Sequence, residues 1–204
     1  MLVVGLTGSI GMGKSTLAAH LRERGIAVFD ADAEVHRLYS GPLAAAVGSA
    51  FEGTVAGGVV DRRKLSEALA RDPSGFKLLE GVVHPLVQLA EQQFLAAERD
   101  KGAELAVLEI PLLFETGAET KFDAVILASA PDDIRRARVL PRAGMTAEKL
   151  DLIVARQGAE AEKRAKADFV VDTGGSHADS LASLDAIIDR LKGRAGTAFV
   201  QHWA

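Results

Sequence analysis

The chain has 204 residues, 48% of them hydrophobic and 25% charged, and its 24 basic and 28 acidic side chains give a net charge of −4. This composition is typical of one folded domain with room for an inserted subdomain, and the absence of cysteine excludes disulfide scaffolds, thiol nucleophiles and thiolate metal sites. There is no basic excess for nucleic acid, and no apolar run reaches the about 18 residues of a membrane helix, so we expect a cytoplasmic protein that binds neither nucleic acid nor a membrane.

Short apolar runs alternate with longer segments of helical periodicity, the first helix being expected at Ser15–Arg24. Continuously apolar runs are typical of parallel strands that are buried on both faces, and strands separated by helices indicate an α/β fold with a doubly wound parallel sheet of about five strands. The predicted strands are Leu2–Leu6, Ile26–Phe29, Leu105–Ile110, Ala124–Ala128 and Phe169–Val171.

Two regions depart from this alternation. Residues 33–100 are mostly helical in pattern and too long for one crossover helix, so we expect an inserted helical subdomain with a loop near Glu52–Asp61. Pro85 predicts a break there that holds His84 extended. Residues 131–160 form a second helical region, with helix starts expected near Ser129 and Thr146. The core is then formed by 1–32, 101–130 and 161–204, where only the tail beyond Gly193 looks loosely structured.

The segment Gly8–Ser15 matches the pattern G-x-x-x-x-G-K-[ST] without deviation, between a predicted strand and a predicted helix. Its glycines let consecutive backbone N–H groups point at phosphate oxygens, and the helix N-terminus adds its positive end. We expect Lys14 to reach the β- and γ-phosphates and the Ser15 hydroxyl to ligate Mg²⁺. The sequence therefore predicts a P-loop NTPase fold, and the motif says more about binding a triphosphate than about its use.

A GTPase and a small-molecule kinase are the first alternatives. Thr120–Asp123 has the T-K-x-D pattern and Asp172–Gly175 the D-x-x-G spacing, but the first precedes a strand instead of following one and the second comes too late in the chain. A kinase fits better, because it needs an acceptor pocket, here 33–100, and a lid that excludes water. The candidate lid, 131–160, carries Arg135, Arg136, Arg138, Arg142 and Arg156.

Several charged side chains have two interpretations. An arginine against the transferring phosphoryl group stabilises its charge, but Arg135 and Arg136 can equally form a solvated face with neighbouring aspartates. Asp30 and Asp32 follow a strand end, where α/β folds place their sites, and either can accept a proton, assist Mg²⁺ or cap the next helix. Glu109, at the end of another apolar run, is either a second carboxylate on the Mg²⁺ side or structural.

Eight strings carry a family resemblance, namely Leu6–Thr16, Asp30–Asp32, Asp61-Arg62, Leu79-Glu80, His84-Pro85, Ile110–Glu115, Arg138 and Arg142 with Gln157, and Ala167-Asp168. In this order they resemble the bacterial dephospho-coenzyme A kinase family over nearly the whole chain. The resemblance implies that ATP phosphorylates the ribose 3′-hydroxyl of dephospho-coenzyme A, giving coenzyme A and ADP, by in-line transfer with Mg²⁺ and lid closure. It also implies a nucleotide core, a helical acceptor subdomain and a helical lid.

The resemblance also implies roles for single residues. Asp32 stands at the position of the catalytic base and Arg142 at that of the lid arginine, with Lys14 as the third catalytic residue. The expected ATP contacts are Gly8, Gly11, Met12, Gly13, Lys14, Ser15, Thr16 and Arg138, and the expected acceptor contacts are Asp32, Arg62, His84, Pro111, Leu112 and Glu115. Three positions depart from the family pattern, namely Met12, His36 and Thr173.

Two other functions fit the same residues. One is an ATP-binding regulatory or assembly protein whose 33–100 segment binds a partner, and the other is a kinase for another nucleoside or small alcohol. For the dephospho-coenzyme A kinase, the expected partner is the small-molecule substrate alone, and the expected state is a monomer or a weak homo-oligomer.

Overall fold

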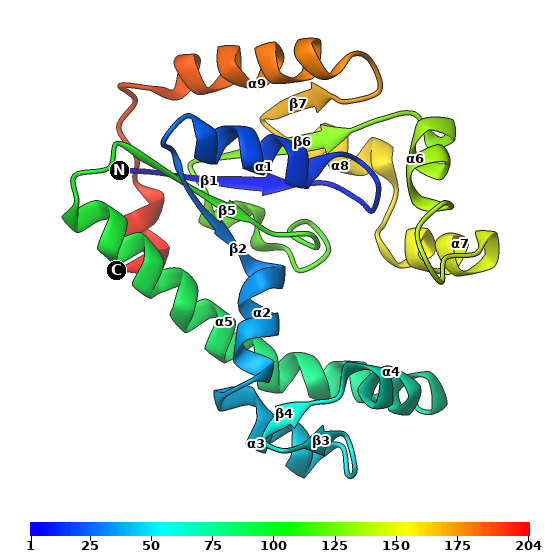
Figure 1. Cartoon of the computed structure of the whole chain (residues 1–204). Helices are drawn as coiled ribbons and strands as arrows, with labels where there is room; N and C mark the ends of the chain where they lie inside the picture. The colour runs from blue at the N-terminus through cyan, green and yellow to red at the C-terminus, as the bar shows by residue number, and fades with distance from the viewer. The chain divides into compact units, whose positions relative to one another are not determined.

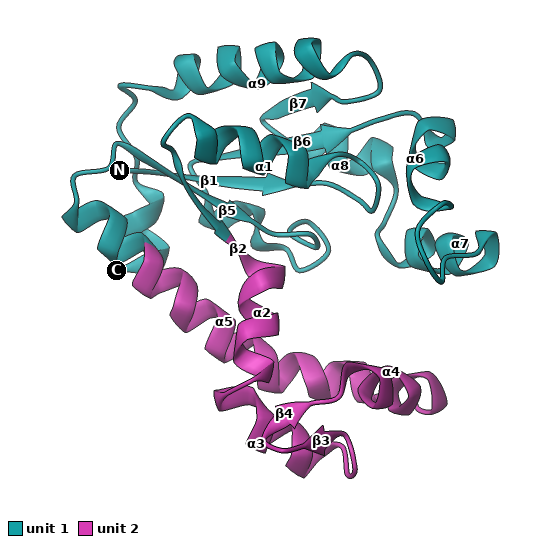
Figure 2. Cartoon of the chain, viewed as in Figure 1, with its two compact units in different colours: residues 1–29, 95–204 teal, residues 30–94 magenta.

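The computed structural model describes all 204 residues, which form two compact units. The first unit comprises residues 1–29 and 95–204, and the second comprises residues 30–94 (Figure 2). The expected insertion, 33–100, begins and ends within six residues of the second unit's limits, and the expected lid, 131–160, lies inside the first unit.

The first unit is built on a five-stranded sheet of order β2-β5-β1-β6-β7 (Figure 1). β1 runs parallel to both β5 and β6, and β6 runs parallel to β7. The strands are β1 (Leu2–Thr7), β2 (Ala27–Asp30), β5 (Leu105–Glu109), β6 (Ala124–Ser129) and β7 (Phe169–Asp172). The predicted α/β class and all five predicted strands are therefore confirmed, with shifts of one residue at some ends.

Helices and loop segments cover both faces of this sheet. Ile126 of β6 belongs to a core that includes buried side chains of α1 and α9, whereas its neighbours Val125 and Leu127 pack with Leu113 and Phe114 on the other face. Burial on both faces explains why the strands are continuously apolar. The helices of this unit are α1 (Lys14–Glu23), α6 (Asp132–Val139), α7 (Ala147–Arg156), α8 (Glu160–Lys166) and α9 (His177–Leu191), with a 3₁₀ turn at Ala118–Lys121.

The predicted loose tail beyond Gly193 is wrong. Residues Phe199–Trp203 form a last helical turn in which Phe199 and Trp203 are buried. The Trp203 indole N–H donates to the carbonyl of Lys121 over 2.8 Å, and its ring lies 5.8 Å from that of Phe122. Two aromatic side chains in the last six residues therefore anchor the carboxyl terminus.

The second unit consists of short helices and one hairpin. Its elements are α2 (Ala31–Tyr39), α3 (Pro42–Ala50), β3 (Val55–Ala56), β4 (Val59–Val60), α4 (Arg62–Arg71) and most of α5 (Gly75–Asp100). The segment predicted as a loop near Glu52–Asp61 contains the hairpin, whose turn is Gly57-Gly58 with φ angles of 58° and 78°. Two glycines at positive φ are the usual signal of a two-residue hairpin turn.

The predicted break at Pro85 is also wrong, because α5 is continuous and His84 is helical. Proline removes one helix hydrogen bond, to the carbonyl of Gly81, and usually kinks or ends a helix. Here the flanking turns contribute Val83, Leu86 and Val87 to a buried cluster with α3 and α4, which offsets the loss. No helix of the chain combines the length and the apolar character that a membrane span requires.

The Asp123 carboxylate explains one of the strings considered above. One of its oxygens accepts the Val3 N–H over 2.8 Å, and the other accepts the Thr197 and Ala198 N–H groups over 2.7 and 3.0 Å. The aspartate of the T-K-x-D string therefore ties β1 to the carboxyl-terminal segment. The aspartate of the D-x-x-G string likewise closes a local turn, accepting the Gly174 N–H over 2.7 Å.

We predict that Asp123→Ala lowers the free energy of unfolding by about 2–4 kcal/mol, because three backbone donors lose a charged acceptor. Urea denaturation measures the loss. Asp100→Ala, at the exposed end of α5, is the matched control and should stay within about 0.5 kcal/mol of the wild type. Equal midpoints for the two variants would contradict the role given to Asp123.

A second stability prediction concerns Gly11, which has a φ of +78°. A Cβ atom there would lie 2.5 Å from Val139 Cγ2, whereas one at Gly25, with a φ of +75°, would meet nothing within 4 Å. Both alanine variants strain the backbone by about 1–2 kcal/mol, and Gly11→Ala should cost a further 1–3 kcal/mol or so through overpacking against the buried Val139. Similar unfolding midpoints for Gly11→Ala and Gly25→Ala would show that the Val139 side chain moves aside without a cost in stability.

Candidate active site

The glycine-rich loop joins the buried strand β1 to α1. Gly11 and Gly13 both have positive φ angles, of 78° and 82°, and Gly13 is the residue that precedes α1. No side chain caps this helix, and although the Thr16 N–H donates to the Gly13 carbonyl over 3.1 Å, the N–H groups of Lys14 and Ser15 have no such partner. The loop at Gly8–Thr16 therefore has the positive-φ glycines and the uncapped helix start that a phosphate-binding loop requires.

Lys14 is held by a buried carboxylate. Its ammonium group lies 2.7 Å from Glu109 Oε1, and Glu109, the last residue of β5, is 2% exposed. The Ser15 hydroxyl is 3.4 Å from the same oxygen. The other oxygen, Oε2, accepts no hydrogen bond and lies 3.6 Å from Arg22 Nη2.

This arrangement fits Mg²⁺. A carboxylate with one oxygen lacking a donor, next to a serine hydroxyl, is the oxygen-ligand chemistry that Mg²⁺ prefers when phosphates complete its shell. No group of three or more histidine or acidic side chains that could hold a metal occurs in the chain, so the protein offers no all-protein cage. Asp30, the other candidate, caps α2 by accepting the Ala33 N–H over 2.9 Å.

Thr173 holds the second half of the loop. Its buried hydroxyl lies 2.8 Å from the Met12 carbonyl and receives an N–H of Arg138 over 3.2 Å. Arg138 also donates to the Gly11 carbonyl over 3.3 Å and to the Thr173 carbonyl. The predicted ATP-contact residues Gly11, Met12 and Arg138 therefore lie together, with Thr173 joining them.

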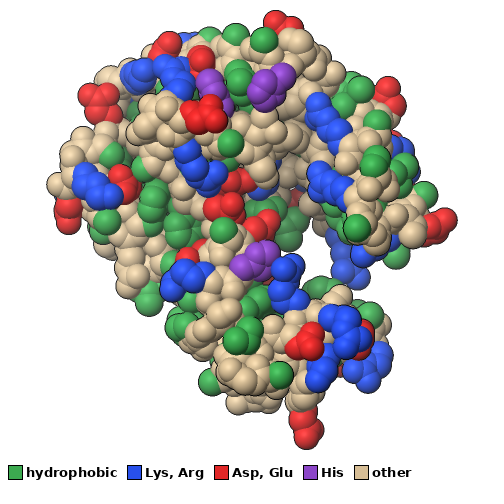
Figure 3. Space-filling view, viewed as in Figure 1, with side chains coloured by type: hydrophobic (Ala, Val, Ile, Leu, Met, Phe, Trp, Pro, Cys, Tyr) green, Lys and Arg blue, Asp and Glu red, His purple; other side chains and the backbone are tan.

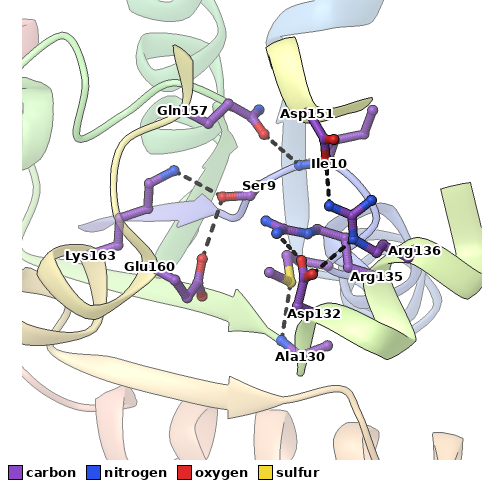
Figure 4. Close-up of polar contacts among 11 residues, drawn as sticks. Ser9, Ile10, Ala130, Asp132, Arg135, Arg136, Asp151, Gln157, Glu160 and Lys163 are labelled. Carbon is purple, nitrogen blue, oxygen red and sulfur yellow. Dashed lines mark hydrogen bonds and ion pairs between the residues drawn. The ribbon is translucent and has the colours of Figure 1, made fainter. Parts of the chain in front are cut away.

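The arginines of α6 and of the turn that follows it divide into paired and unpaired groups. Arg135 and Arg136 both bind Asp132, and Arg136 also reaches Asp151 over 2.5 Å (Figure 4). The hydrogen bonds from Arg136 and Arg135 lower the pKa of the Asp132 carboxyl. The pairing with neighbouring aspartates is therefore present for both, but the Arg135 side chain is only 12% exposed, so only Arg136 lies on a solvated face. Asp132 binds these two arginines and does not cap α6. Arg142, by contrast, is exposed and has no side-chain partner.

The segment after β5 lies beside the first half of the loop. The Thr7 hydroxyl is 3.4 Å from the Pro111 carbonyl, and Leu112 is 41% exposed. Glu115 lies 2.6 Å from the ammonium of Lys163. Lys163 in turn donates to the Ser9 hydroxyl over 2.9 Å (Figure 4). Lys163 gives no signal in the sequence, because α8 carries charged side chains and alanines but no large apolar residue that would mark a buried face.

Gln157 and Glu160 complete the contacts of this half of the loop. The side-chain oxygen of Gln157 accepts the Ile10 N–H over 2.9 Å, and Glu160 lies 3.4 Å from the Ser9 hydroxyl. Next to these residues is a cavity of about 350 Å³ lined by the Met12 side chain and by charged groups of both signs, namely Asp132, Arg135, Glu160, Arg164 and Asp172.

The remaining predicted residues belong to the second unit. Asp32 is exposed in the first turn of α2, two residues after the end of β2 at Asp30. Asp32, His36 and Arg62 line one open cavity of about 260 Å³ whose other walls include Tyr39, Leu65 and Phe76. Basic side chains gather over α4, which begins at Arg62 (Figure 3). His84 is exposed on α5 and does not line this cavity.

The family profile and the sequence relatives that match this chain carry the same description. The family profile described as dephospho-CoA kinase matches residues 2–179. A dephospho-CoA kinase of Rhizobium etli is 53% identical over 169 residues, 83% of each chain. One of Mesorhizobium japonicum is 51% identical over 197 residues, which are 97% of this chain and 100% of the relative.

Solved structures of similar fold support the same family. The crystal structure of TT1252 from Thermus thermophilus superposes with a TM-score of 0.79 at 38% identity, covering 94% of this chain and 98% of that one. A dephospho-CoA kinase from Campylobacter jejuni gives a TM-score of 0.69 at 25% identity, covering 93% and 96%. Since the profile spans most of the chain and the sequence relatives share half of its residues, the chain belongs to the dephospho-CoA kinase family, whose members phosphorylate dephospho-CoA with ATP.

Proposed function

We propose that this protein transfers the γ-phosphoryl group of ATP to the ribose 3′-hydroxyl of dephospho-coenzyme A. The observation that carries the proposal is the complete glycine-rich loop, with Lys14 and Ser15 at the start of α1, in a member of this family. The proposed setting is the cytoplasm, with the enzyme as a monomer or a weak homo-oligomer.

The proposed ATP site uses the backbone of Gly8–Thr16. The amide groups of the loop and the N-terminus of α1 bind phosphate oxygens, and Lys14 exchanges its contact with Glu109 for the β- and γ-phosphates. Glu109 then keeps Ser15 as a neighbour of Oε1, while its Oε2 accepts no hydrogen bond. We propose that Ser15 and Glu109 hold Mg²⁺, which neutralises charge on the β- and γ-phosphates when bound.

Arg142 is the arginine best suited to the transferring phosphoryl group. Arg135 and Arg136 are neutralised by Asp132 and Asp151, and Arg138 is bonded to the Thr173 carbonyl. Arg142 lies in the turn between α6 and α7 without a partner, so no ion pair must break before it binds an anion. A cation in this role stabilises the charge of a loose transition state.

On the acceptor side, we propose that the cavity of the second unit holds part of dephospho-coenzyme A. Its apolar side chains suit the uncharged arm of the substrate, and Arg62 at its rim suits the diphosphate. Asp32 orients the hydroxyl and accepts its proton. A carboxylate is a sufficient base here, because the transition state needs little early proton removal. His84, Pro111, Leu112 and Glu115 are further proposed acceptor contacts.

A coupled assay tests the reaction. ADP should appear only when ATP, Mg²⁺ and dephospho-coenzyme A are all present, and other nucleosides and small alcohols in an acceptor panel should give little turnover. ADP production that needs no acceptor would favour an ATP-binding regulatory protein. Preference for another acceptor would keep the kinase and change its substrate.

We predict that Asp32→Asn binds ATP as the wild type does but loses turnover by about 10²-fold or more, because the hydroxyl loses its acceptor. Steady-state kinetics and an ATP titration measure the two quantities separately. The control is Glu34→Gln, which removes the charge of a carboxylate in the same helical turn that is paired with Arg37. Near-normal turnover of Asp32→Asn would remove Asp32 from this role.

A further inference from the structure

Lys163 is the one lysine or arginine of the chain that is buried, at 4% exposure. An ammonium group is costly to remove from water unless anionic and hydrogen-bonding partners replace the lost hydration. Lys163 lies on α8, outside every motif discussed above, and neither the Mg²⁺ site nor the proposed proton transfer uses it. Its burial therefore needs another explanation.

The partners of this ammonium group come from two segments distant in sequence. It donates over 2.9 Å to the Ser9 hydroxyl, which is itself 5% exposed, and lies 2.6 Å from Glu115 Oε1. Figure 4 shows Lys163 and Glu160 pointing toward Ser9, and the Ser9 hydroxyl lies 3.4 Å from a Glu160 oxygen. Lys163 thus connects the glycine-rich loop to the segment that follows β5.

The backbone around Ser9 has little support of its own. Glycines at 8 and 11 stand on either side of Ser9-Ile10, and within the loop the Met12 N–H donates to the Ser9 carbonyl over 3.1 Å. The other anchors come from Lys163 and Glu160 of α8 and from Gln157, at the end of α7, which accepts the Ile10 N–H over 2.9 Å. Thr173 and Arg138 hold only the later residues of the loop.

We propose that Lys163 is a positioning residue for ATP: it fixes Ser9, and with it the first half of the glycine-rich loop, in the conformation that receives the triphosphate. A loop held in place before binding loses less conformational entropy when the nucleotide arrives, and its N–H groups need no reorganisation. This inference rests on the proposed binding of ATP at Gly8–Thr16.

The test is a titration of the full-length protein with ATP and Mg²⁺ by calorimetry. Lys163→Met keeps the length of the side chain but removes its charge and donors, and should raise the Kd for ATP about tenfold or more. Lys163→Arg restores a cation and should recover most of the affinity. Lys166→Met is the matched control, because it makes the same charge change on the same helix at an exposed ion pair, and its Kd should stay within about twofold of the wild type.

Separate readouts distinguish positioning from stability. A purely structural lysine would lower the melting temperature and leave the Kd of the folded protein unchanged, so a Kd within about twofold of the wild type for Lys163→Met overturns the inference. If that variant does not fold, Ser9→Ala is tested in its place, and its Kd for ATP should rise about threefold or more. An unchanged Kd for Ser9→Ala would contradict the inference. Wild-type protein that binds no ATP would instead contradict the proposed function.

Discussion

The backbone of Gly8–Gly13 is the constraint on which the rest of the structure depends. Its N–H groups can receive phosphate oxygens only if they stay largely without internal partners, and a backbone without internal partners must be held from outside. The sheet holds one end through the buried strand β1, and α1 continues from the other. Side chains from distant parts of the chain, Thr173 on one side and Gln157 and Lys163 on the other, fix what lies between.

Charge is distributed around this loop in pairs. Lys14 has Glu109, Lys163 has Glu115, and Arg135 and Arg136 have Asp132. Most cations near the loop are therefore neutralised, which limits repulsion among them in the absence of a polyanion. A triphosphate must compete with these carboxylates, so its binding energy is the difference between two sets of strong contacts.

How far the sequence predicted this structure depended on the range of the interactions. The strands were readable because burial on both faces leaves an unbroken apolar run, and the loop because its glycines are required by local φ angles. The continuity of α5 through Pro85 could not be predicted, because it depends on the packing of Val83 and Leu86 against residues of α3 and α4 that are distant in the sequence. Lys163 gave no signal, because its burial depends on Ser9 and Glu115, more than forty residues away in the chain.

The packing of the carboxyl terminus has a practical consequence. Trp203 is the single tryptophan, and its indole is buried with its N–H bonded to the Lys121 carbonyl. Indole emission from this protein thus originates from one chromophore, whose spectrum shifts to the red when that last turn becomes hydrated. Tryptophan fluorescence would register melting of the first unit, whereas unfolding confined to residues 30–94, which hold the single tyrosine, Tyr39, would leave the indole signal unchanged.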